Sequence, residues 1–195
     1  MISLYLVRHG EVKEGRTRFM GHTDCSLTDE GKAQMARFVE KLREAPLQAV
    51  YASDLTRARA GGQLIADSHS LALRTDIALR ERCWGAWDGL SANEAESRDP
   101  ELWQSWSKAP FFHSPEGAEK PDEFFTRVTA MVKQIIGLHA GENVAVVCHA
   151  GVIRAVHAWF TGRWPDGFFD LSPAYGSLHR FDADSNFKMK QYIPE

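Results

Sequence analysis

Short runs of apolar residues alternate along the chain with longer stretches in which apolar residues recur every three or four positions. The short runs, at residues 2–7, 49–52, 72–75 and 143–148, have the length and composition of buried strands. The longer stretches have the periodicity of helices that bury one face. This alternation predicts a three-layer α/β/α fold in which helices cover both faces of a mostly parallel central sheet.

Four helices follow from this periodicity and from signals at the helix ends. The first has Thr28 as its N-cap and extends to Pro46, and the second begins near Asp54. The third covers about 121–139. The fourth, 150–160, begins directly after the last of the apolar runs.

Two segments depart from the alternation. Residues 177–181 and 188–193 flank a polar turn and predict a hairpin, one strand of which lies antiparallel at the edge of the sheet. Residues at about 91–121 are irregular and carry aromatic side chains between prolines: Trp103, Trp106, Phe111, Phe112 and His113. We expect a lid-like excursion over the carboxyl edge of the sheet, where open α/β folds bind ligands. Alternatively, these rings pack a small core of their own.

Composition narrows the class of protein. The 195 residues, 44% hydrophobic and 25% charged, suit a single domain over 1–195 with a substantial core. A net charge of −3 gives no general attraction to nucleic acid or membrane, and no apolar stretch approaches the roughly 20 residues of a membrane span or resembles a signal segment. Three cysteines, an odd number without metal-ligand spacing, predict a cytoplasmic protein without a disulfide or a metal site.

The candidate chemistry lies where two predicted strands end. Arg8, His9 and Gly10 follow the first strand, and His149 follows the strand at 143–148. Successive strand side chains point to opposite faces, so Arg8 and His9 converge on one ligand only if the backbone leaves strand geometry, which Gly10 permits. Two histidines at strand ends, with arginines nearby, suit a phosphate anion.

Four motifs in this order resemble the histidine phosphatase superfamily, the phosphoglycerate-mutase-like proteins, over nearly the whole chain. They are Arg8-His9-Gly10-Glu11, Ser53-Asp54-Leu55-Thr56-Arg57-Ala58, Leu79-Arg80-Glu81-Arg82 with Gly85 and Gly89, and His149-Ala150-Gly151. The resemblance implies a phosphoglycerate-mutase-like fold. It also implies a phosphomonoesterase that uses no metal or cofactor, acts on a small phosphorylated metabolite and releases inorganic phosphate.

The resemblance implies roles for the residues of these motifs. His9 attacks phosphorus and becomes phosphohistidine; it must be neutral, and we expect its other ring nitrogen to bond a backbone carbonyl near Gly10. Arg8 and Arg57 grip the phosphate oxygens. His149, expected to be protonated because phosphate favours its charged form, completes the clamp. Taken singly, such histidines are usually core residues and such arginines are usually solvated.

Glu81 is, by resemblance, the general acid for the leaving oxygen and then the base for the water that splits phosphohistidine. This role requires a raised pKa, which partial burial beside the tryptophans that follow it would provide. The alternative is an exposed loop glutamate paired with Arg80 or Arg82.

Three further residues are candidates for substrate binding. Free N–H groups around Ala150 open the fourth predicted helix with partial positive charge. Arg16 and His22 lie in a cationic loop, 11–25, that either meets the substrate or is solvated surface. This loop departs from the family, since Val12, Glu14 and Gly15 stand where many members have Ser and Asn. A backbone N–H or Arg16 would have to replace the hydrogen bond of the missing Asn.

Within the superfamily the sequence looks most like α-ribazole phosphatases, on Gly21-His22-Thr23, Trp87-Asp88-Gly89 and Tyr175-Gly176-Ser177. The expected substrate is therefore α-ribazole 5'-phosphate of cobalamin biosynthesis, whose flat base suits an aromatic cover. The alternatives are a phosphoglycerate mutase or a sugar-phosphate phosphatase. A non-catalytic phospho-ligand-binding protein is a different class of function, against which the retention of His9, Glu81 and His149 argues.

Overall fold

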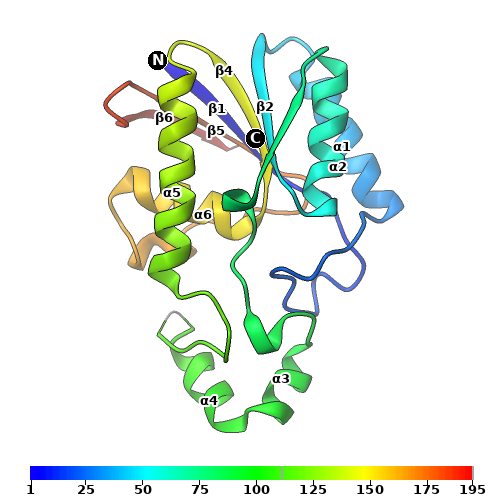
Figure 1. The fold of residues 1–195 in the computed structure, drawn as a ribbon, viewed down its shortest axis with the longest axis vertical. Helices are drawn as coiled ribbons and strands as arrows, with labels where there is room; N and C mark the ends of the chain where they lie inside the picture. Colours follow the sequence, from blue (N-terminus) through cyan, green and yellow to red (C-terminus); the bar gives the residue numbers. More distant parts are fainter. Residues whose placement is uncertain (111, 195) are drawn as a thin grey trace.

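The computed structural model describes residues 1–110 and 112–194 and has a central sheet of six strands in the order β3-β2-β4-β1-β5-β6 (Figure 1). The strands β1 to β4 run parallel, β5 is antiparallel to β1, and β6 is antiparallel to β5 at the edge. This arrangement confirms the predicted α/β fold and the hairpin. The strands are β1 (Ile2–Arg8), β2 (Leu47–Ser53), β3 (Leu73–Asp76), β4 (Asn143–Cys148), β5 (Leu178–Ala183) and β6 (Met189–Pro194).

Two pairs of helices cover the faces of the sheet (Figure 1). Alternate residues of β1 serve opposite faces: Leu4 and Leu6 pack in the core with α5 and α6, whereas Tyr5 and Val7 pack in the core with α1 and α2. Because both faces are buried at the centre of the sheet, β1 and β4 are mostly apolar, whereas the edge strand β3 has no buried residue. The helices of these layers are α1 (Asp29–Leu42), α2 (Thr56–Ser68), α5 (Pro121–Leu138) and α6 (Ala150–Thr161).

The observed ends of α1 and α2 can be compared with the ends predicted from local sequence signals. The Thr28 side chain caps α1 by accepting from Gly31 N, as predicted. The helix ends at Leu42, four residues before Pro46. Helix α2 begins two residues later than predicted, at Thr56, where the backbone N–H and the hydroxyl both donate to the carboxylate of Asp24.

The excursion over 91–121 contains two short helices that the sequence pattern did not predict, α3 (Ala92–Arg98) and α4 (Pro100–Lys108). They lie at the end of the molecule opposite the N-terminus (Figure 1). Three-residue and four-residue 3₁₀ turns complete the fold: η1 (Ile77–Leu79), η2 (Gly85–Trp87) and η3 (Asp166–Phe169).

An aromatic cluster joins this excursion to the loop after β1. Its rings lie within 6.3 Å of one another in the pairs observed, and it consists of Phe19, Trp84, Trp87, Trp103 and Trp106. Trp87 is fully buried, and its Nε1 donates to Asp99 at 2.8 Å. Part of the excursion therefore packs a small core, as the alternative interpretation holds. Phe112 is 80% exposed, and Phe111 lies outside the described residues.

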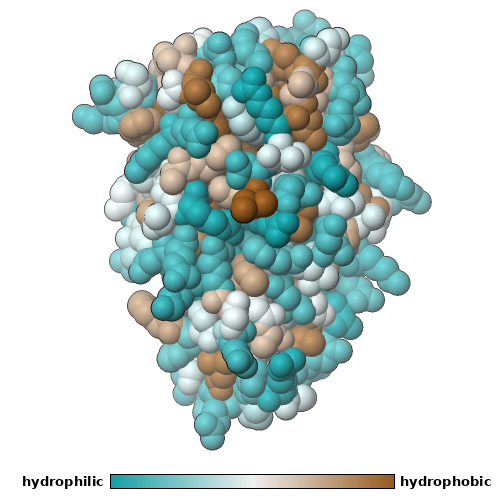
Figure 2. Space-filling view, viewed as in Figure 1, coloured by the Kyte–Doolittle hydropathy of each residue, from teal (hydrophilic) through white to brown (hydrophobic). Residues whose placement is uncertain are grey.

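The face of the molecule in Figure 2 is mostly hydrophilic, with apolar residues scattered over it. Such scattered side chains are normal on a protein surface. Within the described ranges, no helix is both long and apolar enough for a membrane span.

The topology places a crevice at the carboxyl ends of β1 and β4. These two strands are hydrogen-bonded neighbours, with Arg8 opposite Cys148. The helix that follows β1 packs on one face of the sheet, and the helix that follows β4 packs on the other. The chain therefore diverges between the two strands, which is where open α/β sheets bind ligands.

Candidate active site

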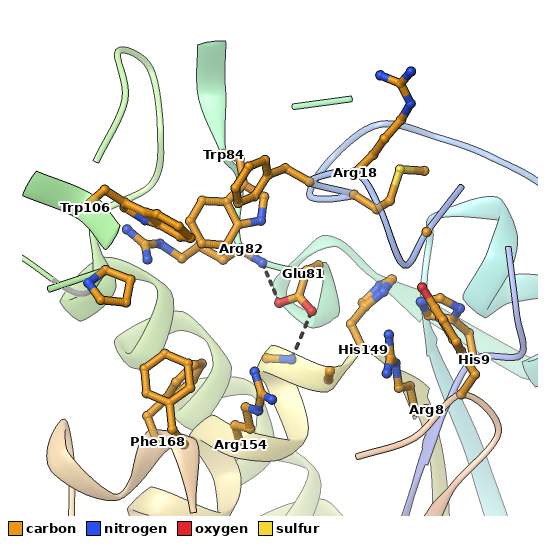
Figure 3. Close-up of a pocket in the computed structure, with 18 residues that line it drawn as sticks. Arg8, His9, Arg18, Glu81, Arg82, Trp84, Trp106, His149, Arg154 and Phe168 are labelled. Carbon is orange, nitrogen blue, oxygen red and sulfur yellow. Dashed lines mark hydrogen bonds between the residues drawn. The ribbon is translucent and has the colours of Figure 1, made fainter. Parts of the chain in front are cut away.

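A cavity of about 370 Å³ lies at this point (Figure 3). One end of the cavity holds His9, His149 and Arg8. The other end holds Trp84 and Trp106. The structure thus brings together five of the predicted residues in one cavity wall: Arg8, His9, Glu81, His149 and Ala150.

His9 is held in one orientation at the start of the loop after β1. Its Nδ1 lies 2.7 Å from the carbonyl oxygen of Gly10, which confirms the predicted hydrogen bond. Because a carbonyl only accepts, Nδ1 carries the proton and Nε2 keeps its lone pair in the neutral ring. Burial, and then the charge of Arg57, hold the pKa of His9 well below 6.5. The neutral form required of a nucleophile is therefore the favoured form.

Arg8 and Arg57 bring buried positive charge to this end of the cavity. Arg57, predicted to grip the phosphate, does not line the cavity as the described residues form it. Its side chain is fully buried, and its terminal nitrogens donate to three backbone carbonyl oxygens in the loop 20–23. Arg8 donates to Pro173 O and stacks on Tyr175, with 3.8 Å between the guanidinium carbon and the ring centroid. The Nε of each arginine is buried and has no partner among the described residues.

His149 is fully buried at the start of α6, 5.0 Å from His9 between ring centroids. Neither of its ring nitrogens has a hydrogen-bond partner in the part of the chain that the structure describes. Burial, followed by the charge of Arg57, lowers the pKa of His149 well below its usual value. The protein's own groups thus oppose the expected protonation of His149, and only a strongly negative ligand would reverse this preference.

Glu81 lies between the two histidines and the aromatic end of the cavity (Figure 3). Its carboxylate accepts from the backbone N–H of Arg82 and from that of Gly151, each at 2.9 Å. Arg80 pairs with Asp54 instead of Glu81. A Cβ on Gly151 would lie 2.0 Å from the Glu81 carboxylate, so glycine is what lets this carboxylate reach the start of α6.

Arg16 and His22 do not line the cavity as the described residues form it. The Arg16 side chain is 73% exposed and pairs with Glu11 at 3.5 Å. The ring of His22 instead faces the backbone carbonyl oxygen of Glu81, with 3.0 Å from Nε2 to the oxygen. Arg16 nevertheless lines a neighbouring hollow with Arg8 and Tyr175, and its guanidinium carbon lies 5.8 Å from the centroid of the Tyr175 ring. Contact of Arg16 or His22 with a substrate therefore stays a prediction.

Sequence reasoning missed Arg154 and Tyr175, which also line the cavity. Arg154 lies four residues after Ala150 on α6. Since residues i and i+4 share a helix face, this spacing was a usable signal. Tyr175 comes from the loop before β5, and its position against Arg8 depends on tertiary contacts alone.

A substitution at Gly10 tests how tightly this loop is built. A Cβ on Gly10 would lie 2.1 Å from the backbone oxygen of Gly31, at the start of α1. Because backbone atoms must move to make room, we expect Gly10→Ala to destabilise the protein by about 1–3 kcal/mol or more. Urea unfolding measures this loss. Gly137→Ala on α5 is the matched control, since its Cβ has no atom within 4 Å; equal stability of the two variants would contradict the packing described.

The chain matches a known protein family and several known proteins. The model of the histidine phosphatase superfamily (branch 1) matches residues 4–191. The chain is 37% identical over 158 residues to phosphoglycerate mutase-like protein 4 of Arabidopsis thaliana, which covers 79% of this chain and 69% of that protein.

Two further proteins resemble this chain. A metal-independent phosphoserine phosphatase of Arabidopsis thaliana is 33% identical, over 81% of this chain and 68% of its own length. The crystal structure of the α-ribazole phosphatase from Shigella flexneri superposes with a TM-score of 0.91 at 22% identity, covering 99% of this chain and 96% of the other. The superposition extends the likeness to the whole fold.

Proposed function

The chain belongs to the histidine phosphatase superfamily and is thus an enzyme of the phosphatase class, and from this premise we propose that it hydrolyses a small phosphomonoester through a phosphohistidine at His9. The supporting observation is the buried cluster at the carboxyl ends of β1 and β4. It sets a neutral His9, with its Nδ1 bonded to Gly10 O, beside buried donors of Arg8, Arg57 and His149 that lack partners among the described residues.

The reaction has two steps on this cluster. Nε2 of His9 forms a bond to phosphorus while the ester oxygen leaves and takes a proton from Glu81. Water then attacks the phosphohistidine, gives its proton to Glu81 and frees inorganic phosphate. The charges of Arg8 and Arg57, with hydrogen bonds from His149 and Ala150 N, stabilise the phosphoryl oxygens in both steps. The proposal assigns no role at phosphorus to Arg16 or His22.

Two substrates are candidates. α-Ribazole 5'-phosphate is favoured by the aromatic end of the cavity, where Trp84 and Trp106 would pack on a flat base, and by the likeness to α-ribazole phosphatases. Phosphoserine is favoured by the 33% identical relative and by the arginines of the wall. We further propose that 1–195 acts as one domain in the cytoplasm, with 91–121 covering the leaving-group end.

A screen of purified protein over a panel of phosphorylated metabolites tests this function. We expect hydrolysis of at least one phosphomonoester, with activity retained in EDTA, because arginines supply the positive charge that a metal would otherwise bring. Isomerisation of phosphoglycerate without release of phosphate would identify a mutase instead. A large loss with EDTA that a divalent ion restores would contradict the charge argument.

A further inference from the structure

Arg154 is a charged residue of the cavity wall that has no role in the reaction proposed at His9. It rises from α6 between Phe168 and Glu81 (Figure 3). Its Nε donates to Leu171 O at 2.9 Å. Within 1–110 and 112–194, its two terminal nitrogens have neither a hydrogen-bond partner nor an ion pair. One edge of the guanidinium fork is therefore free for a ligand.

The other arginines of the wall are already engaged. Arg18 pairs with Glu14 and Glu94, each at 2.6 Å. Arg82 donates to Glu119 O and to the hydroxyl of Ser114. Arg8 stacks on Tyr175 beside His9, at the phosphate end. Among the described residues of this wall, Arg8 thus serves the phosphate end, and the terminal nitrogens of Arg154 are left for another group.

Arg154 is half-buried beside two aromatic rings. Its guanidinium carbon lies 5.9 Å from the ring centroid of Phe168 and 5.4 Å from that of Phe169. The nearby carboxylate is that of Glu81, which accepts from two backbone N–H groups. Burial lowers the pKa of Arg154, and the charge of Glu81 offsets this only in part. An anionic ligand at the free terminal nitrogens would stabilise the charged form further.

We propose that Arg154 binds a carboxylate on the leaving group, so that the substrates of this enzyme are phosphomonoesters of hydroxy acids or hydroxy amino acids. The inference rests on the proposed function. The planar fork of arginine matches a carboxylate in shape and charge. Arg154 and Arg8 line the same cavity of about 370 Å³. A small substrate therefore spans both sites. This inference favours phosphoserine-like substrates over α-ribazole 5'-phosphate, which has no carboxylate.

A matched pair of probes tests the inference. 3-Phosphoglycerate and glycerol 3-phosphate differ in one group, a carboxylate in the first and a hydroxymethyl in the second. We expect the wild-type protein to favour 3-phosphoglycerate in kcat/KM. Arg154→Gln should lower kcat/KM for 3-phosphoglycerate by about 10–100-fold, mainly through KM, because a charge-assisted bidentate contact is lost. The value for glycerol 3-phosphate should change by less than about 3-fold, because this probe has no carboxylate for Arg154 to bind. Arg154→Lys should recover part of the loss.

Two controls separate this role from others. The Arg163 side chain lies just after α6, is 58% exposed and pairs with Asp170. Arg163→Gln should leave kcat/KM unchanged for both probes. The inhibition constant of inorganic phosphate should be unchanged in Arg154→Gln.

The outcomes distinguish the inference from the function on which it rests. Equal losses for the two probes, weaker inhibition by phosphate, or a wild-type protein that does not favour the carboxylate would overturn the inference while leaving the phosphatase intact. Preference for α-ribazole 5'-phosphate with no effect of Arg154→Gln would do the same. If the wild-type protein hydrolyses neither probe nor p-nitrophenyl phosphate, the proposed function itself fails.

Discussion

Replacing His9 with alanine is expected to lower phosphatase turnover by about 10³-fold or more, because the group that bonds to phosphorus is removed. In the wild-type protein, brief mixing with labelled substrate and an alkaline quench should leave a phosphoprotein that is stable in base and labile in acid. The label should be absent from His9→Ala. These measurements follow the covalent step itself and not only the release of phosphate.

The control for this variant is His113→Ala, which removes a half-buried histidine of the excursion that does not line the described cavity wall. It should keep its activity and its label. Because His9 is buried, circular dichroism must show that His9→Ala is folded. A folded His9→Ala protein that retained most of its turnover would exclude His9 as the nucleophile.

The regular part of the fold was predictable because its signals are local. Strand β4 was predicted with its observed bounds, Asn143–Cys148, since an apolar run of that length is bounded by polar residues on one side and His149 on the other. The N-cap at Thr28 was predicted for the same reason. The start of α2 was not, because its capping carboxylate comes from Asp24, 32 residues away.

The excursion was not predictable from periodicity. Helix α3 has seven residues and α4 has nine, with Asp99 alone between them. Such short helices are marginal by themselves. Here they are stabilised by contacts distant in sequence, since Trp103 and Trp106 pack against Phe19. The sequence of residues 91–121 alone does not show that Phe19 is the packing partner.

In the candidate site, too, some residues could be placed from local sequence signals and others could not. His9 and His149 could be placed because each follows a predicted strand, and adjacent strands bring them together. The composition of the loop 11–25 gave no direction for the side chains of Arg16 and His22, which contact Glu11 and the backbone carbonyl of Glu81 respectively. The neutral preference of His149 depends on full burial beside Arg57, and no local pattern encodes this.

Glu81→Gln is expected to slow the phosphorylation of His9 in a way that depends on the leaving group. An alkoxide needs a proton as it departs, whereas p-nitrophenolate leaves nearly unaided. Loss of the general acid should therefore slow single-turnover phosphorylation by an alkyl phosphate by roughly 10²–10⁴-fold and by p-nitrophenyl phosphate far less. Single-turnover conditions are needed, because loss of the base slows dephosphorylation equally for both substrates.

Gly151→Ala offers a second way to disturb the same group without removing it. The new Cβ would lie 2.0 Å from the Glu81 carboxylate, which must swing away from the backbone N–H of residue 151. We expect the same leaving-group dependence as in Glu81→Gln, with a smaller loss, because the carboxylate is displaced rather than deleted. Gly137→Ala, whose Cβ meets no atom within 4 Å, should leave both rates unchanged. If Glu81→Gln slowed phosphorylation equally with the two substrates, Glu81 would not be the acid, and Asp88 or another carboxylate would take that role.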